Sequence, residues 1–104
     1  MLIQINTDNT LENNARLQQY FSNELETSLA RFSDRITRID VHFGDENGEK
    51  FANDDKRCLI EARLAGIAPI TATHHAATLE TAFQGAVAKL KTLLSKLQEK
   101  EKEY

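Results

Sequence analysis

The chain has 104 residues, a length that predicts one domain, spanning residues 1–104, with one hydrophobic core. Hydrophobic residues make up 40% of the chain and charged residues 28%, which is an ordinary globular composition and argues against wholesale disorder. A net charge of −3 argues against a protein that coats nucleic acid through bulk charge, and the absence of a long apolar run argues against a membrane span. We therefore expect a cytoplasmic protein.

The N-terminal third predicts a strand followed by a helix. Residues 2–6 alternate, with Ile3 and Ile5 on one side, as a half-buried strand does. Asp8, Asn9 and Thr10 then offer acceptors to the free backbone donors of a helix that starts near Leu11 and continues to about Asp34. Its apolar stripe follows helical spacing and consists of Leu11, Ala15, Phe21, Leu25, Leu29 and Phe32.

Two arginines lie on one flank of this predicted helix. Arg31 and Arg35 are one turn apart, so they could act together on one ligand. The alternative is a solvated flank in which they pair with Glu24 or Asp34, an arrangement that contributes little to stability.

Three further segments alternate as strands do. They are residues 36–43, 57–64 and 69–75, and the stretch 44–56 between the first two is rich in Gly, Asn and Asp, which predicts a long hairpin connection. Their apolar positions include Ile39, Val41, Ile60 and Ala62. The opposite face, which we expect to be open to water, carries Arg38, Asp40, His42, Glu61 and Arg63.

Residues 78–102 predict a long amphipathic helix. Its apolar stripe consists of Leu79, Phe83, Ala86, Val87, Leu90, Leu94 and Leu97. The predicted order is therefore β-α-β-β-β-α, an α+β fold in which both helices pack on one face of a four-stranded sheet.

Lysines border the stripe of the last helix on both sides. Lys89, Lys96 and Lys100 fall about 80 to 120° to one side of Leu90, and Lys91 and Lys102 fall to the other. Their aliphatic stems could simply cover the edge of the core. Equally, the two rows could follow phosphates on a structured RNA.

No residue pattern predicts catalysis or a metal site. The histidines are His42, His74 and His75, and the last two are neighbours on a predicted strand and point to opposite faces, so they cannot share a metal without a distortion. Cys58 falls on the apolar face, where a thiol behaves as a small hydrophobe. We therefore expect neither an enzyme nor a bound metal.

Two segments resemble a known family. The stretches ITRIDVHFGDENGEK with DDKRCLIEARLAG, and THHAATLETAFQGAVAKLKTLLSKL, are similar to the bacterial short ribosome hibernation-promoting factors and ribosome-associated inhibitor A proteins, also called sigma-54 modulation proteins. The resemblance implies a domain like the double-stranded-RNA-binding fold, which occupies the decoding channel of the small ribosomal subunit during stress and excludes mRNA and tRNA. It implies ribosomal RNA as partner, no DNA, no membrane and no cofactor.

The residues that we expect to bind RNA are Arg31, Arg35, Lys89, Lys91 and Lys96, of which Arg31, Lys89 and Lys96 align with basic positions of the family. Thr78 and Glu80 stand where relatives have an acid followed by a tyrosine, and Glu24 stands where a relative has a basic residue. A second hypothesis is therefore a protein-interaction or regulatory module on the same scaffold, with weak or no ribosome binding. We expect a monomer, with a dimer through the open sheet face as the alternative.

Overall fold

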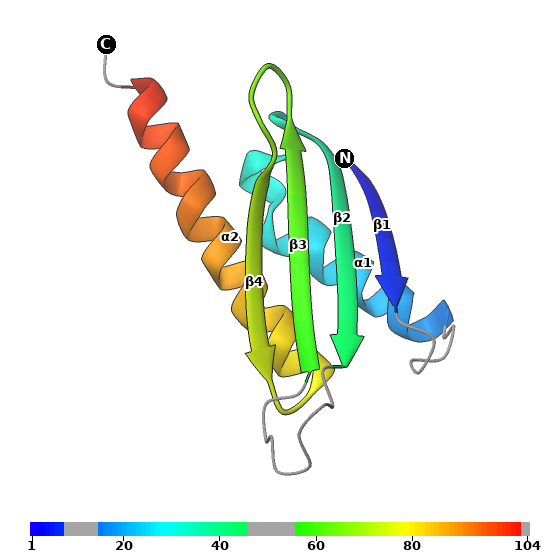
Figure 1. The fold of residues 1–104 in the computed structure, drawn as a ribbon. Coiled ribbons are helices and arrows are strands. Elements are labelled where there is room, and N and C mark those ends of the chain that lie inside the picture. The colour runs from blue at the N-terminus through cyan, green and yellow to red at the C-terminus, as the bar shows by residue number, and fades with distance from the viewer. Residues whose placement is uncertain (8–14, 46–55, 103–104) are drawn as a thin grey trace.

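The computed structural model describes residues 1–7, 15–45 and 56–102, and its elements follow the predicted order (Figure 1). They are strand β1 (Leu2–Thr7), helix α1 (Ala15–Ser28), a short 3₁₀ helix η1 (Ala30–Phe32), strands β2 (Ile36–Asp45), β3 (Lys56–Leu64) and β4 (Ile70–Ala76), and helix α2 (Leu79–Lys102). The β-α-β-β-β-α order and the α+β class are confirmed.

The sheet is mixed, with strand order β1-β2-β3-β4. Strands β2, β3 and β4 pair antiparallel as predicted, whereas β1 pairs parallel with β2, so that Ile5 lies opposite Val41. A parallel pair needs a crossover connection, and α1 lies within that crossover. In the described part of the chain, β1 and β4 are therefore the two edges of the sheet.

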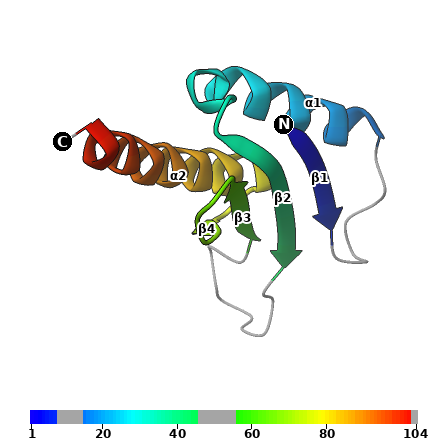
Figure 2. The ribbon, with the colours of Figure 1, turned by 90° about the horizontal axis from the view of Figure 1, so that it is seen from above.

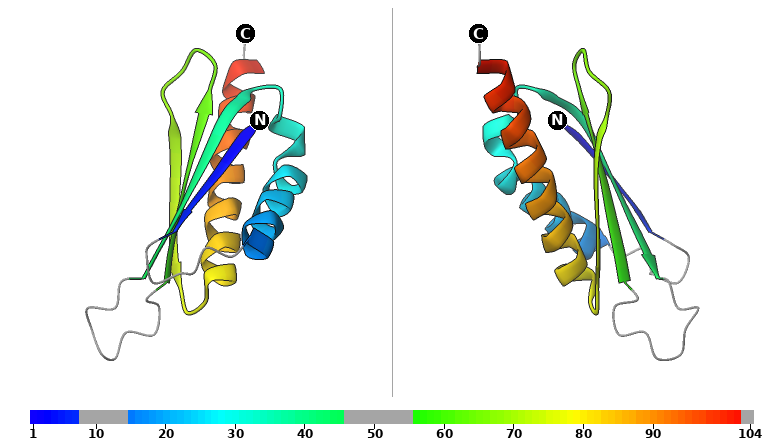
Figure 3. Two further views of the ribbon diagram at one scale, coloured as in Figure 1. Left: turned by 90° about the vertical axis from the view of Figure 1, so that its right-hand side faces the viewer. Right: turned by 60° about the vertical axis from the view of Figure 1, so that its left-hand side comes forward.

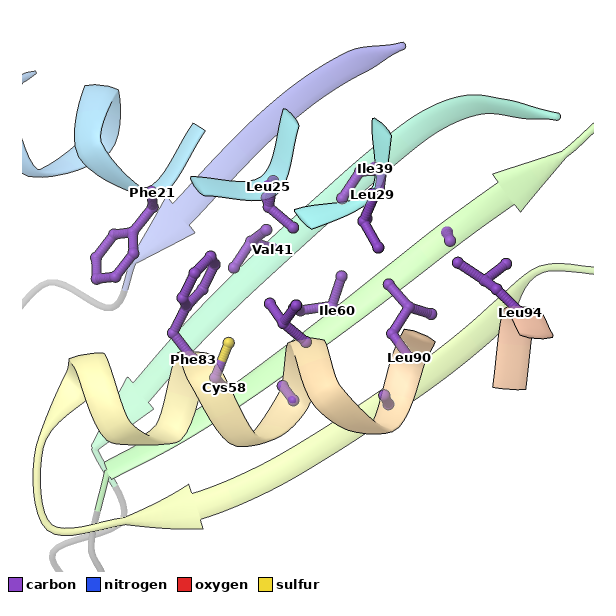
Figure 4. Close-up of a cluster of buried hydrophobic side chains, with 14 of the residues drawn as sticks. Phe21, Leu25, Leu29, Ile39, Val41, Cys58, Ile60, Phe83, Leu90 and Leu94 are labelled. Atoms are coloured by element: carbon purple, nitrogen blue, oxygen red, sulfur yellow. The ribbon is translucent and has the colours of Figure 1, made fainter. Parts of the chain in front are cut away.

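Both helices cover the same face of the sheet, which Figures 2 and 3 show from above and from the sides. The reason is the alternation of the strands, because Ile39, Val41 and Ile60 are fully buried on that face. Side chains from α1, β2, β3 and α2 converge there into one core (Figure 4).

Three phenylalanines join the two helices to the sheet. The ring centroid of Phe21 in α1 lies 4.8 Å from that of Phe43 in β2 and 4.6 Å from that of Phe83 in α2. Each side chain is at most 2% exposed. Aromatic pairs at this separation contribute about 0.5–1.5 kcal/mol beyond their buried area, so this cluster fixes where α1 and α2 meet.

The predicted stripe of α2 is confirmed. Five of its members are buried, namely Phe83, Ala86, Val87, Leu90 and Leu94, and Leu79 and Leu97 pack against the core at its ends. The helix begins at Leu79, one residue later than predicted, because Thr78 is its cap: the Thr78 hydroxyl accepts a hydrogen bond of 3.1 Å from the Thr81 backbone N–H.

The end of the first helix was predicted wrongly. Helix α1 ends at Ser28 rather than Asp34, and the chain tightens into η1, in which the Phe32 N–H donates to the Leu29 carbonyl at 2.9 Å. Residues three apart lie above one another in a 3₁₀ turn, which keeps both Leu29 and Phe32 in the core. Ala15, predicted in the stripe, is exposed.

The predicted hairpin connection was drawn too long. Gly44 and Asp45 belong to β2 and Lys56 to β3, where Lys56 Nζ donates to Asp45 Oδ2 at 3.0 Å. The remainder of that connection, the helix start near Leu11 and the cap at residues 8–10 lie outside the described residues. No helix in the described ranges is long and apolar enough to cross a membrane.

A close contact between β4 and α2 was not foreseen from the sequence. Gly85 lies under the imidazole ring of His74, and a Cβ atom on Gly85 would overlap that ring. Glycine in a helix interior costs about 1 kcal/mol relative to alanine, so this position gives up helix propensity to bring helix and strand together. The contact also shows that the His74 side chain lies on the side of β4 that faces α2.

We predict that Gly85→Ala destabilises the protein by about 1–2 kcal/mol, because the overlap with His74 outweighs the gain in helix propensity. In a His74→Ala background the same change is expected to stabilise the protein by about 0.5–1 kcal/mol. Urea unfolding of the four proteins measures both values. Equal effects of Gly85→Ala in the two backgrounds would show that the imidazole does not set the requirement for glycine.

The buried thiol of Cys58 gives a second prediction. Burial raises the pKa of the Cys58 thiol to about 12, so almost no thiolate forms at neutral pH. A thiol-specific disulfide reagent is expected to leave the folded protein unmodified at pH 8 and to modify one thiol at once in denaturant. Rapid modification of the folded protein would contradict the packing described for β3.

Candidate functional site

The candidate cationic residues fall on two borders of α2. Lys89 and Lys96 lie on the side that faces β4, where Lys89 Nζ donates to the Thr73 carbonyl at 2.8 Å and Lys96 lines a groove with Ile70. We call this the strand-side border. All of these residues come from α2 and the edge strand.

The other border faces α1 and η1, and we call it the helix-side border. Arg31 of η1 donates from Nη2 to Gln98 Oε1 of α2 at 3.2 Å, which places the arginine beside the helix. Lys91 lies about two turns before Gln98 on the same side of α2 and is exposed. The structure thus brings Arg31, Arg35 and Lys91 to one border and leaves Lys89 and Lys96 on the other.

Arg35 is held by α2. Both guanidinium nitrogens Nη1 and Nη2 donate to the two carboxylate oxygens of Glu101, the Nη2 bond measuring 2.7 Å. This hydrogen bonding lowers the pKa of the Glu101 carboxyl and raises that of the Arg35 guanidinium. The pair is partly exposed, and its two charges cancel, so Arg35 offers little positive field to a ligand in this arrangement.

Arg31, unlike Arg35, is bonded to an uncharged side chain. Its guanidinium carbon lies 4.7 Å from the centroid of the Phe32 ring, a cation–π distance, and its partner Gln98 is neutral. The alternative, in which these arginines pair with Glu24 or Asp34, is therefore wrong: their partners are Gln98 and Glu101. Both partners lie more than sixty residues away in sequence, beyond the reach of a helical-wheel argument.

The opposite end of the helix-side border is acidic. The Tyr20 hydroxyl of α1 donates to Glu80 Oε2 of α2 at 2.6 Å, and this bond is the main reason that the pKa of Tyr20 rises to about 12. Glu24 is close enough to raise that pKa further. Two of the three residues that depart from the family pattern, Glu24 of α1 and Glu80 of α2, thus place negative charge near the start of α2, away from Arg31.

The open face of the sheet carries charges that are paired with one another. Arg38 donates to both carboxylate oxygens of Asp40, at 2.8 and 3.0 Å, which lowers the pKa of Asp40. Arg63 lies 3.5 Å from Glu61. Asp40 is only 8% exposed, so the expectation that this residue is open to water is wrong, because the Arg38 side chain covers it.

Residues 1–7, 15–45 and 56–102 contain no group of three or more His, Cys, Asp or Glu side chains arranged to hold a metal ion. Cys58 is fully buried, as predicted, and its thiol is protonated. The side chains that remain as candidates for ligand binding are the cationic ones on the borders of α2.

Comparisons with known proteins agree with this fold. The family model described as sigma 54 modulation protein / S30EA ribosomal protein matches residues 3–102. A comparison with curated proteins found no match.

Two solved structures share the fold. A ribosomal subunit interface protein from Coxiella burnetii is 22% identical, with a TM-score of 0.71, over 95% of this chain and 99% of that one. The N-terminal domain of Protein Y from Thermus thermophilus is 21% identical, with a TM-score of 0.73, over 93% of this chain and 99% of that one. Because the family model spans nearly the whole sequence, the chain belongs to the sigma 54 modulation protein / S30EA ribosomal protein family, as the sequence resemblance indicated.

Proposed function

We propose that this protein is a ribosome-associated translation inhibitor that binds ribosomal RNA in the decoding channel of the small subunit. The observation that carries the proposal is the family match over residues 3–102. One relative of the same fold is a ribosomal subunit interface protein, which supports a ribosomal partner for this chain. A protein that binds ribosomes acts in the cytoplasm, and we propose this location for the chain.

The proposed mechanism is steric. Residues 1–104 act as one domain that fills the path of mRNA and tRNA, so the inhibitor and the translating state exclude each other by mass action. Such a protein performs no reaction and needs no cofactor, metal, DNA or membrane. It acts as a monomer, because one copy fills one channel.

The proposed RNA contacts come from both borders of α2. Lys89 and Lys96 on the strand-side border, and Arg31 and Lys91 on the helix-side border, flank a helix that is about 10–12 Å across with its side chains. Rows on both sides of one helix can meet phosphates of two RNA segments at once. Arg35 joins them only when its bond to Glu101 opens.

A second candidate function is a protein-interaction or regulatory module with weak or no ribosome binding. The observation that favours it is electrostatic: the chain carries a net charge of −3, and one of its five candidate cations is neutralised by Glu101. Analytical ultracentrifugation separates the two functions, because a salt-insensitive dimer that does not bind ribosomes fits only the second.

Co-sedimentation with small ribosomal subunits over a series of salt concentrations tests the first function. We expect binding at low salt that weakens steeply as salt rises, since phosphate contacts release counterions. The double variant Lys89→Glu/Lys96→Glu is expected to bind at least about tenfold more weakly at low salt, with a salt slope shallower by about 2. Each lost lysine accounts for about one unit of that slope.

The matched control is Arg16→Glu/Arg63→Glu, which makes the same change in charge outside the proposed surface and should bind much more tightly than the lysine variant. No binding of the parent protein at any salt concentration would overturn the proposed function. Equal weakening by the two double variants would overturn the assignment of Lys89 and Lys96.

Release of Arg35 gives a separate prediction. Glu101→Gln removes the carboxylate that neutralises Arg35, so small-subunit affinity is expected to rise by about threefold to tenfold and the salt slope to steepen by about 1. Glu99→Gln makes the same change of net charge two residues away, without touching Arg35, and is expected to have a smaller effect. Equal affinities of the two variants would show that the Arg35–Glu101 pair does not limit binding.

A further inference from the structure

A groove runs between the edge strand β4 and the C-terminal half of α2. Figure 1 shows α2 crossing the sheet obliquely and continuing beyond the edge formed by β4. Two adjoining hollows of about 480 and 400 Å³ follow this divergence and share Leu93. The first is lined by Ile70, Leu93, Lys96, Leu97, Glu99 and Lys100, and the second by Thr71, Ala72, Thr73, Lys89, Thr92 and Leu93.

One wall of the groove is a strand edge with backbone groups directed away from the sheet. Thr73 lies opposite Leu59 in the register, and its carbonyl accepts a hydrogen bond from Lys89 Nζ, which reaches it from α2 outside the sheet. In an antiparallel ladder a residue either exchanges both backbone hydrogen bonds with its opposite or neither. The N–H and C=O of Thr73 therefore face outward, where an added strand could meet them.

The floor of the groove is apolar. Leu93 is 39% exposed, although it lies on a helix whose other leucines are buried or half-buried, and Ile70 and Leu97 flank it at partial burial. An extended chain lying along β4 would direct every second side chain toward these residues. Apolar residues at alternate positions would be favoured there.

The rim of the groove is cationic. Lys89, Lys96 and Lys100 line it, against one acidic residue, Glu99. A second copy of this chain would bring its own three lysines to the same place, and like charges at such an interface disfavour it. A partner whose carboxylates lie beside its apolar residues, on the side of the extended chain that faces α2, complements the rim instead.

We propose that this groove binds an extended peptide segment of a protein partner, which carries apolar and acidic residues together on one of its two faces, as an added strand along β4. The peptide backbone pairs with Thr71 and Thr73, its apolar side chains cover Leu93, and its carboxylates meet Lys96 and Lys100. Lys89 leaves the Thr73 carbonyl to a peptide N–H and pairs with a carboxylate. The inference goes beyond ribosome binding and does not depend on it.

The probe is a short synthetic peptide in which every second residue is in turn valine or glutamate, with serine between them, so that both kinds of side chain face α2. Amide NMR of the whole protein is the measurement. We expect shifts of the Thr71 and Thr73 amides and of the α2 amides around Leu93, with slowed hydrogen exchange at Thr73 because its N–H gains a partner. A valine–lysine peptide and a serine–glutamate peptide, which lack the acidic and the apolar component respectively, should each shift these amides much less.

Two variants separate the parts of the site. Leu93→Gln removes apolar surface from an exposed position and should weaken peptide binding about tenfold while leaving ribosome co-sedimentation unchanged. Thr73→Pro removes the outward N–H at an edge, where proline is tolerated, and should weaken the peptide-induced shifts of the Thr71 amide and of the α2 amides around Leu93. If Thr73→Pro fails to fold, Leu93→Gln alone decides.

Several results would overturn the proposal. They are no shift at β4 with the valine–glutamate peptide, equal shifts with the valine–lysine peptide, or no weakening by Leu93→Gln. Concentration-dependent shifts of the β4 amides without peptide would assign the groove to a second copy. Shifts with an oligouridylate and none with the peptide would assign it to RNA.

Discussion

The structure depends on one sheet face that must be covered. Strands β2 and β3 place Ile39, Val41 and Ile60 on a single side, and each of these side chains is fully buried. Burying apolar surface contributes about 25 cal/mol per Å² and is the dominant favourable term in folding. Because one long helix with a continuous stripe provides most of that cover, the position of α2 determines which polar residues meet at its margins.

The margins of α2 differ in consequence. On the helix-side border, α1 and η1 approach closely enough for Tyr20 to bond Glu80 at one end and for Arg31 and Arg35 to bond Gln98 and Glu101 at the other. On the strand-side border, α2 diverges from β4, so Lys89 and Lys96 stand over a groove instead of a neighbouring helix. The same packing thus yields a self-paired border and an open one, although the two borders carry similar cations in the sequence.

Local periodicity was sufficient to predict the order of the elements, the core face of β2 and β3 and the stripe of α2. These features arise from interactions within a few residues or from a pattern repeated along one element. The boundary at Ser28 was not predictable in the same way, since the change to a 3₁₀ turn keeps Leu29 and Phe32 in the core and so depends on the sheet beneath them.

Side-chain contacts between elements that are distant in sequence could not be predicted from the sequence alone. Glu101 is a partner of Arg35 only because α2 passes over the end of η1, and Gly85 is required only because His74 lies above it. Asp40 alternates like a solvent-facing residue, yet Arg38, two residues earlier on the same strand, covers it. Each of these contacts changes the charge or the shape of a candidate surface. The sequence therefore indicates which cationic residues are candidates, but it does not indicate which of them are already paired within the fold.

We propose that this small, net-acidic member of the family occupies the decoding channel through the cationic borders of α2. Chemical footprinting of ribosomal RNA in isolated small subunits, with and without the protein, tests it most directly. We expect the protein to protect decoding-channel nucleotides from modification. Prior addition of mRNA and tRNA is expected to prevent this protection. Protection confined to other regions, or none at a protein concentration that saturates co-sedimentation, would contradict it.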